Sequence, residues 1–149
     1  MNLSTEQQAR LEKLLYEVES EKEFLQLFAQ VEDKFELHEL ASSMNWDGGY
    51  FELNQVLNHP NLDKGTALLL YWYGEPEYFA EYSSLDEVED CNRMNGIFVK
   101  AVEEKLLNDN FKSNSIRFDP IADRGINKLQ QKKLKENAGI PEALKVANI

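Results

Sequence analysis

The stretch "HPNLDKGTALLLYWYGEPEYF", residues 59–79, decides the fold. It contains the longest apolar run of the chain, seven residues from Ala67 to Tyr73, whereas a membrane-spanning helix needs roughly 20. Gly65 and Thr66 precede this run, and Gly74 follows it. We predict one buried helix that has Thr66 as its N-cap and Gly74 as the residue just past its end.

The turn residues around this helix have predicted roles of their own. Gly65 is expected to permit a tight turn, and a side chain there would be destabilising if its φ is positive, while Asp63 is expected to orient the turn through side chain–backbone hydrogen bonds. A second turn is predicted at Asp47-Gly48-Gly49. The predicted structural turn residues are Gly49, Asp63, Gly65, Thr66 and Gly74.

The remaining segments show helical spacing and helix-capping signals. Ser84 and Glu87, for example, have capping-box spacing and predict the start of the longest helix. Helices are expected near residues 4–18, 20–31, 35–44, 50–58, 76–82, 84–108 and 123–137, with a last short helix after Pro141. We therefore predict an all-α fold of stacked antiparallel helical hairpins in a single compact domain, with at most one short extended segment near residues 115–118.

The charge of the chain is unevenly distributed. Residues 1–110 carry eight Lys or Arg against 23 Asp or Glu, a net charge of −15, whereas residues 111–149 carry eight against four, a net charge of +4. We expect one helical domain over residues 1–149, with the basic C-terminal segment packed on the acidic body. An acidic body repels phosphate and attracts basic protein surfaces, so the expected partner is a protein, neither nucleic acid nor a membrane.

The compartment is inferred from the N-terminus and from cysteine usage. The N-terminus shows no basic stretch followed by an apolar core, so no signal peptide is predicted. The single cysteine, Cys91, is expected to be buried or half-buried, and a lone cysteine is typical of a reducing compartment. We expect a soluble cytoplasmic protein.

Two segments follow the pattern of a helical hairpin repeat. "PNLDKGTALLLYWYGEPEYF" resembles part of an ankyrin unit, and "ELHELASSMNWDGGYFELNQVLNHPN" is a looser version of it. The spacing is not constant, because Gly49 and Gly74 are 25 residues apart while Leu37 and Leu68 are 31 apart. An ankyrin array keeps a period of about 33 residues over three or more units. The pattern therefore indicates two degenerate helical hairpins.

Three motifs carry a closer resemblance over residues 36–82, about a third of the chain. They are Leu37-His38-Glu39-Leu40-Ala41, Asn45-Trp46-Asp47-Gly48-Gly49 and His59-Pro60-Asn61-Leu62-Asp63-Lys64-Gly65-Thr66-Ala67-Leu68-Leu69. In these motifs the chain resembles a bacterial family, domain of unknown function 4274. Small acidic bacterial proteins of this kind resemble immunity proteins, which neutralise a toxin by binding it. By analogy we expect a non-catalytic protein-binding domain whose partner is a toxin domain with a basic surface.

The candidate binding surface lies at the two edges of the opening stretch. Residues 75–90, "EPEYFAEYSSLDEVED", place seven acidic residues beside aromatic ones, a composition that suits capture of a basic protein surface. Trp46 either fills a gap between hairpins or anchors a partner. Of Tyr71, Trp72 and Tyr73, at least one is expected to point outward. The predicted partner-binding residues are Trp46, Asp47, Tyr50, Glu75, Glu77, Tyr78, Glu81, Tyr82, Asp86 and Glu87.

Two other functions stay open. The loops that carry Asp47, His59 and Asp63 are candidates for a small-ligand site or an acid–base site. Their spacing matches no metal-binding or catalytic motif, so we predict no catalytic residue, no metal and no cofactor. The alternative for these residues is a structural role in their loops. The second open function is that of a structural, self-assembling helical module. A monomer and a homodimer are both compatible with the sequence.

Overall fold

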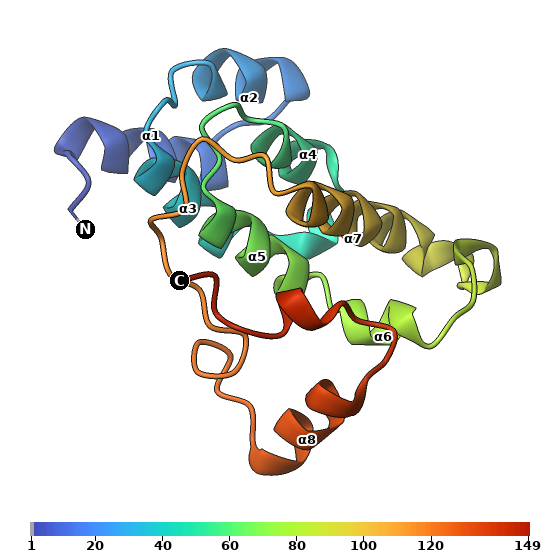
Figure 1. Cartoon of the computed structure of the whole chain (residues 1–149). Coiled ribbons are helices and arrows are strands. Elements are labelled where there is room, and N and C mark those ends of the chain that lie inside the picture. Colours follow the sequence, from blue (N-terminus) through green and yellow to red (C-terminus); the bar gives the residue numbers. More distant parts are fainter. Residues whose placement is uncertain (1) are drawn as a thin grey trace.

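The computed structural model describes residues 2–149, and this part of the chain forms helices and no strand (Figure 1). The all-α prediction is therefore confirmed. The α-helices are α1 (Thr5–Tyr16), α2 (Glu21–Phe28), α3 (Lys34–Ser43), α4 (Phe51–Leu57), α5 (Lys64–Tyr73), α6 (Pro76–Ala80), α7 (Asp90–Asn108) and α8 (Lys128–Glu136). The 3-10 helices are η1 (Trp46–Gly48), η2 (Leu85–Glu87) and η3 (Glu142–Leu144). Within residues 2–149, every helix is too short or too polar to cross a lipid bilayer.

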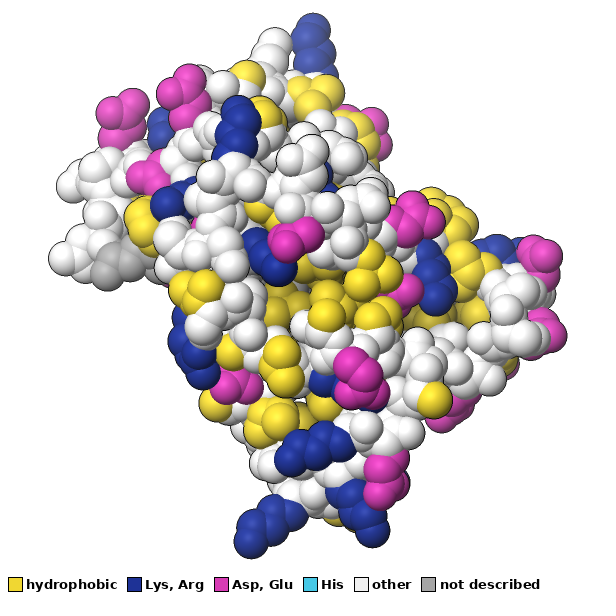
Figure 2. All heavy atoms as spheres, viewed as in Figure 1, with side chains coloured by type: hydrophobic (Ala, Val, Ile, Leu, Met, Phe, Trp, Pro, Cys, Tyr) yellow, Lys and Arg dark blue, Asp and Glu magenta, His cyan; other side chains and the backbone are white. Residues whose placement is uncertain are grey.

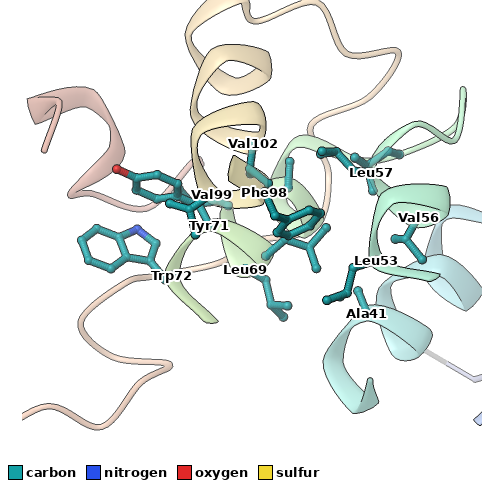
Figure 3. Close-up of a cluster of buried hydrophobic side chains, with 14 of the residues drawn as sticks. Ala41, Leu53, Val56, Leu57, Leu69, Tyr71, Trp72, Phe98, Val99 and Val102 are labelled. Carbon is teal, nitrogen blue, oxygen red and sulfur yellow. The ribbon is translucent and has the colours of Figure 1, made fainter. Parts of the chain in front are cut away.

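Helix α5 lies at the centre of the molecule, where it packs against α3 and α7. Figure 3 shows side chains of α5 next to Phe98, Val99 and Val102 of α7. Tyr71 and Trp72 are 0% and 1% exposed, and the large apolar area that they bury is a main source of stability. The apolar run therefore forms core, except at its last residue, because the Tyr73 side chain is 40% exposed.

The polar atoms of the two buried aromatics have partners, as burial requires. The Tyr71 hydroxyl donates a hydrogen bond of 2.8 Å to the Glu103 carboxylate. Burial, followed by that hydrogen bond, raises the pKa of Tyr71 well above its usual range. The Trp72 indole Nε1–H donates to the Leu144 carbonyl at 2.9 Å. The second contact attaches the C-terminal residues to the centre of the core.

The first turn of α5 is capped by Asp63, and the prediction that Thr66 is the N-cap is wrong. The Asp63 carboxylate accepts a hydrogen bond of 2.9 Å from the Gly65 backbone N–H, while Thr66 lies within the helix. Thr66 is fully buried, and its hydroxyl is 2.9 Å from Nδ1 of His38 on α3. Burial lowers the pKa of His38, which favours the neutral imidazole in this pair.

Asp63 also holds the segment that follows α7, and we call this group of hydrogen bonds the Asp63 clasp. Its carboxylate, 0% exposed, accepts from the Ser115 backbone N–H at 2.8 Å, the Ser113 hydroxyl at 2.7 Å and the Ile116 backbone N–H at 3.1 Å. Burial alone would raise the pKa of Asp63, but these hydrogen bonds and the one from Gly65 outweigh it and lower the pKa. The clasp connects positions about 50 residues apart with a buried, ionised carboxylate.

Gly65 lies beneath the same segment, and its φ is not positive. The glycines with positive φ are Gly49, at 97°, and Gly125, at 61°. A Cβ atom on Gly65 would overlap the Ile116 carbonyl oxygen and lie 2.7 Å from the carbonyl carbon. Glycine is needed here because the backbone of the clasped segment approaches α5 closely.

The end of α5 also differs from its predicted form. Gly74 has a φ of −78°, in the right-handed region, and the left-handed residue is Glu75, with a φ of 60°. Gly74 is instead a close-approach position, because a Cβ atom there would lie 2.5 Å from a methyl group of Val99. The left-handed turn at Glu75 changes the direction of the chain into α6, which begins at Pro76.

Two predicted helix starts lie too early in the chain. Helix α7 begins at Asp90, because residues 85–87 form η2 and Glu87 accepts a hydrogen bond of 2.8 Å from the Ser83 hydroxyl. The basic helix begins at Lys128, with a capping box formed by Asn127 and Gln130. Residues 115–118 form no strand among the described residues, although the clasp keeps their backbone hydrogen-bonded.

The basic C-terminal segment contacts the acidic body. The Arg124 guanidinium lies 4.6 Å from the centre of the Trp72 ring and pairs with the Glu77 carboxylate at 3.0 Å. Basic side chains gather at the end of the molecule formed by α8 (Figure 2). At the other end of the chain, Arg10 of α1 pairs with Glu36, which is 1% exposed, through hydrogen bonds of 2.9 and 3.1 Å. Carboxylates of the body are thus paired with arginines from both flanks.

Candidate functional site

The loop of residues 46–50 and the first residue of the acidic segment meet at one pocket of about 550 Å³. We call it the acidic–aromatic pocket. It is lined by Trp46, Asp47, Gly49, Tyr50, Tyr73, Glu75, Cys91, Asn92 and Asn95. Four of these, Trp46, Asp47, Tyr50 and Glu75, belong to the predicted partner-binding set. The structure therefore brings together residues from both edges of the opening stretch.

The loop on one side of the pocket is held by local contacts. Asn45 accepts a hydrogen bond of 2.9 Å from the Asp47 backbone N–H and so starts η1. Gly49, with its positive φ, then directs the chain towards α4. These contacts leave the Asp47 carboxylate exposed at the tip of the loop.

Trp46 is both packed and accessible. Its ring centre is 5.5 Å from that of Phe98 and 6.2 Å from that of Tyr50, in edge-to-face geometry in both pairs. The indole Nε1 is buried, and no described residue accepts a hydrogen bond from it. Trp46 thus fills space above α7 while part of its ring lines the pocket.

The end of α5 supplies the opposite wall. Tyr73 is its last residue, and its ring centre is 6.3 Å from that of Phe118. The left-handed backbone at Glu75 places this exposed carboxylate at the pocket. Tyr73 was not among the predicted binding residues, because the sequence indicated that one of Tyr71, Trp72 and Tyr73 points outward but not which one.

The electrostatics of the pocket are strongly one-sided. Asp47 and Glu75 form no ion pair with any described residue, and no Lys or Arg lines the pocket. Burial raises the pKa of Tyr50, and the nearby Asp47 charge raises it further, so the phenol stays neutral. The pocket therefore favours cationic groups and disfavours phosphates and carboxylates.

The first turns of α7 form the remaining wall, which was hardly predictable from the sequence. Cys91 is exposed, so the prediction that it is buried or half-buried is wrong. Asn92 donates a hydrogen bond of 3.2 Å to the Tyr78 hydroxyl, which connects the pocket to α6. Asn95 has a buried Oδ1 without a partner among the described residues. The polar Asn95-Gly96 pair within an otherwise apolar helix face was the available signal.

The other predicted partner-binding residues lie around α6 and η2. Tyr78 and Tyr82 are half-buried, with ring centres 5.5 Å apart, while Asp86 and Glu87 are exposed. Glu81 is exposed and shares a smaller pocket, of about 210 Å³, with Glu77 and residues of α8. Because Glu77 is already paired with Arg124, it is less available to a partner than the other carboxylates.

The residues of the alternative acid–base site do not share a pocket. Asp63 is fully buried in the clasp, whereas Asp47 lies at the acidic–aromatic pocket. The Nε2 atom of His59 lies 2.7 Å from the Val31 carbonyl oxygen. Its Nδ1 atom accepts a hydrogen bond of 3.0 Å from the Asn61 backbone N–H. Both ring nitrogens of His59 are therefore used to hold its loop. Among residues 2–149, no three His, Cys, Asp or Glu side chains are grouped so as to hold a metal ion.

Comparison with known proteins assigns the chain to a family without adding an activity. The family model described as "Domain of unknown function (DUF4274)" matches residues 32–107. No curated protein and no solved structure matches the chain. The matched residues include η1, α5 and most of α7, so all three walls of the acidic–aromatic pocket lie within the family region.

Proposed function

The chain belongs to the family described as domain of unknown function (DUF4274), and we propose that it is a non-catalytic bacterial protein-binding domain. In this proposal it is an immunity protein that neutralises a cognate toxin by occluding the active or binding surface of that toxin. The observation that carries the proposal is the acidic–aromatic pocket, with two carboxylates that no described cation neutralises.

The chemistry of the surface supports a basic protein partner. Trp and Tyr side chains provide large contact areas at low entropic cost, and they are enriched at the centres of protein interfaces. Exposed carboxylates around them accept charge-assisted hydrogen bonds from Arg and Lys. The net charge of −15 on residues 1–110 would also speed the encounter with a basic partner.

The proposal is tested with the protein encoded next to this chain in its genome. Coexpression should give a stable complex, and the chain should protect cells from the toxicity of the neighbour. No complex together with no protection would refute the proposed function.

Charge reversal tests the electrostatic part of the proposal. Glu81→Lys with Asp86→Lys should slow association about three- to tenfold at low salt, with a smaller effect at high salt because ions screen the exposed charges. Glu77 is left unchanged because its pairing with Arg124 supports the fold. A control with the same charge change, Glu12→Lys with Glu104→Lys, alters exposed positions of α1 and α7 away from this surface. If both pairs of substitutions slowed association equally, α6 and η2 would not belong to the interface.

A further inference from the structure

The acidic–aromatic pocket is more specific than a general acidic surface. We propose that it receives an arginine side chain of the protein partner, with the guanidinium between the aromatic walls and the carboxylates of Asp47 and Glu75. The inference deepens the proposed function and rests on it in one respect, which is that the arginine belongs to a protein.

The shape of the pocket suits one extended cationic side chain. Its volume of about 550 Å³ falls within the range of small-ligand sites, roughly 300–1,000 Å³. Trp46 and Tyr50 come from the loop of residues 46–50 and Tyr73 from the end of α5, so aromatic surface lies on two sides. A guanidinium stacks on such rings through cation–π attraction, and it is less strongly hydrated than the ammonium of lysine.

Several polar groups of the pocket are hydrogen-bond acceptors, although the Trp46 indole N–H is a buried donor without a partner among the described residues. Two carboxylates are without ion-pair partners among the described residues, and the Asn95 Oδ1 is buried without a donor. An unsatisfied buried acceptor is unfavourable, and a new donor would relieve it. Arginine offers five N–H donors in a planar fork and no acceptor, so it can serve several acceptors at once.

The same chain already uses this mode of binding internally. The Arg124 guanidinium lies 4.6 Å from the centre of the Trp72 ring and pairs with the Glu77 carboxylate at 3.0 Å. That contact combines an aromatic face with a carboxylate, and the acidic–aromatic pocket offers the same combination without a resident cation. The internal pair shows that these geometries are compatible with this fold.

Cys91 provides a direct measurement, since it is the only cysteine of the chain and lines the pocket. The intact protein is alkylated with iodoacetamide in the presence of the peptide acetyl-Gly-Arg-Gly-amide, or of the same peptide with citrulline or lysine in place of arginine. In parallel, NMR follows the indole N–H signal of Trp46, assigned with a Trp46→Phe variant. We expect the arginine peptide to slow alkylation and shift the indole signal, at concentrations about tenfold lower than the other two peptides need.

Variants separate specific recognition from general attraction. Asp47→Asn with Glu75→Gln should weaken arginine-peptide binding about tenfold while preserving side-chain size. The control, Glu12→Gln with Glu104→Gln, removes the same two charges from outside the pocket and should leave binding unchanged. Equal binding of the citrulline or lysine peptide, or equal weakening by both variant pairs, would overturn the inference.

The peptide experiment and the partner experiment can fail separately. The peptide titration uses no partner protein. A negative titration would refute the assignment of an arginine to the pocket, and complex formation with the neighbouring protein could still occur. Failure of complex formation, in turn, refutes the proposed function while the titration still decides what the pocket binds.

Discussion

Gly65→Ala should destabilise the protein by about 2–4 kcal/mol, although the same change within a helix ordinarily stabilises by about 0.5–1 kcal/mol. The new Cβ atom would overlap the carbonyl oxygen of Ile116, which belongs to the backbone and cannot rotate away. Overpacking of this kind costs about 1–3 kcal/mol. Displacement of Ile116 would also stretch its hydrogen bond to Asp63, and a bond to a charged group contributes about 1.5–3 kcal/mol. The helical gain of alanine offsets only part of this loss.

Urea unfolding followed by far-ultraviolet circular dichroism measures this change, with thermal unfolding as a second readout. For a chain of this length the melting temperature should fall by about 5–15 °C. Gly48→Ala is the matched control, because the nearest atom to its new Cβ would be 3.8 Å away and it should leave stability nearly unchanged. If Gly65→Ala were as stable as the wild type, the close approach of the clasped segment to α5 would be disproved.

Substitutions at two further positions test the backbone and the charge at the ends of α5. Asp63→Asn should destabilise by about 3 kcal/mol at neutral pH, because an amide cannot accept all the hydrogen bonds of the clasp. The folded-state pKa of Asp63 is lowered, so its contribution is present above the unfolded-state pKa, about 3.9, and is lost as the pH falls through the folded value. Urea unfolding between neutral and acidic pH should show wild type and variant converging at acidic pH, and a constant gap would contradict the clasp as an ionic contact. Glu75→Gly should raise stability by about 0.5–1 kcal/mol by removing the left-handed strain, whereas Glu75→Ala should not. Thermal melts of the two variants compare them directly, and equal stability would contradict the strained backbone at residue 75.

The parts of the fold that were predictable depend on neighbours in the sequence. Ser4 and Ser20 cap α1 and α2 through hydrogen bonds from residues three positions later, a spacing that is visible in the sequence. The N-cap of α5 was misassigned because Asp63 and Thr66 are both good capping residues and lie close together. What decides between them is burial of Thr66 against His38, a contact 28 residues distant.

Only part of the candidate site was predictable, because only some of its residues stand out from their neighbours in the sequence. Trp46, Asp47, Tyr50 and Glu75 stood out as aromatic and acidic residues in turns. Cys91, Asn92 and Asn95 did not, because their only signal is a polar interruption in a helix whose packing partner was unknown. Which face of α7 meets the loop of residues 46–50 depends on tertiary packing, and no local pattern encodes it.

The Asp63 clasp has a consequence for where this domain begins and ends. The family match stops at residue 107, yet the carboxylate of Asp63 accepts hydrogen bonds from backbone and hydroxyl groups of residues 113–116, and the Trp72 indole N–H donates to the Leu144 carbonyl. Upstream of the match, Arg10 supplies the countercharge of buried Glu36. A chain cut to the matched residues would lose the hydrogen-bond donors of one carboxylate and the cation of the other, together with the packing that buries both. The contacts that hold the matched region therefore extend past it on both sides, and we infer that the folding unit is longer than the region of sequence similarity.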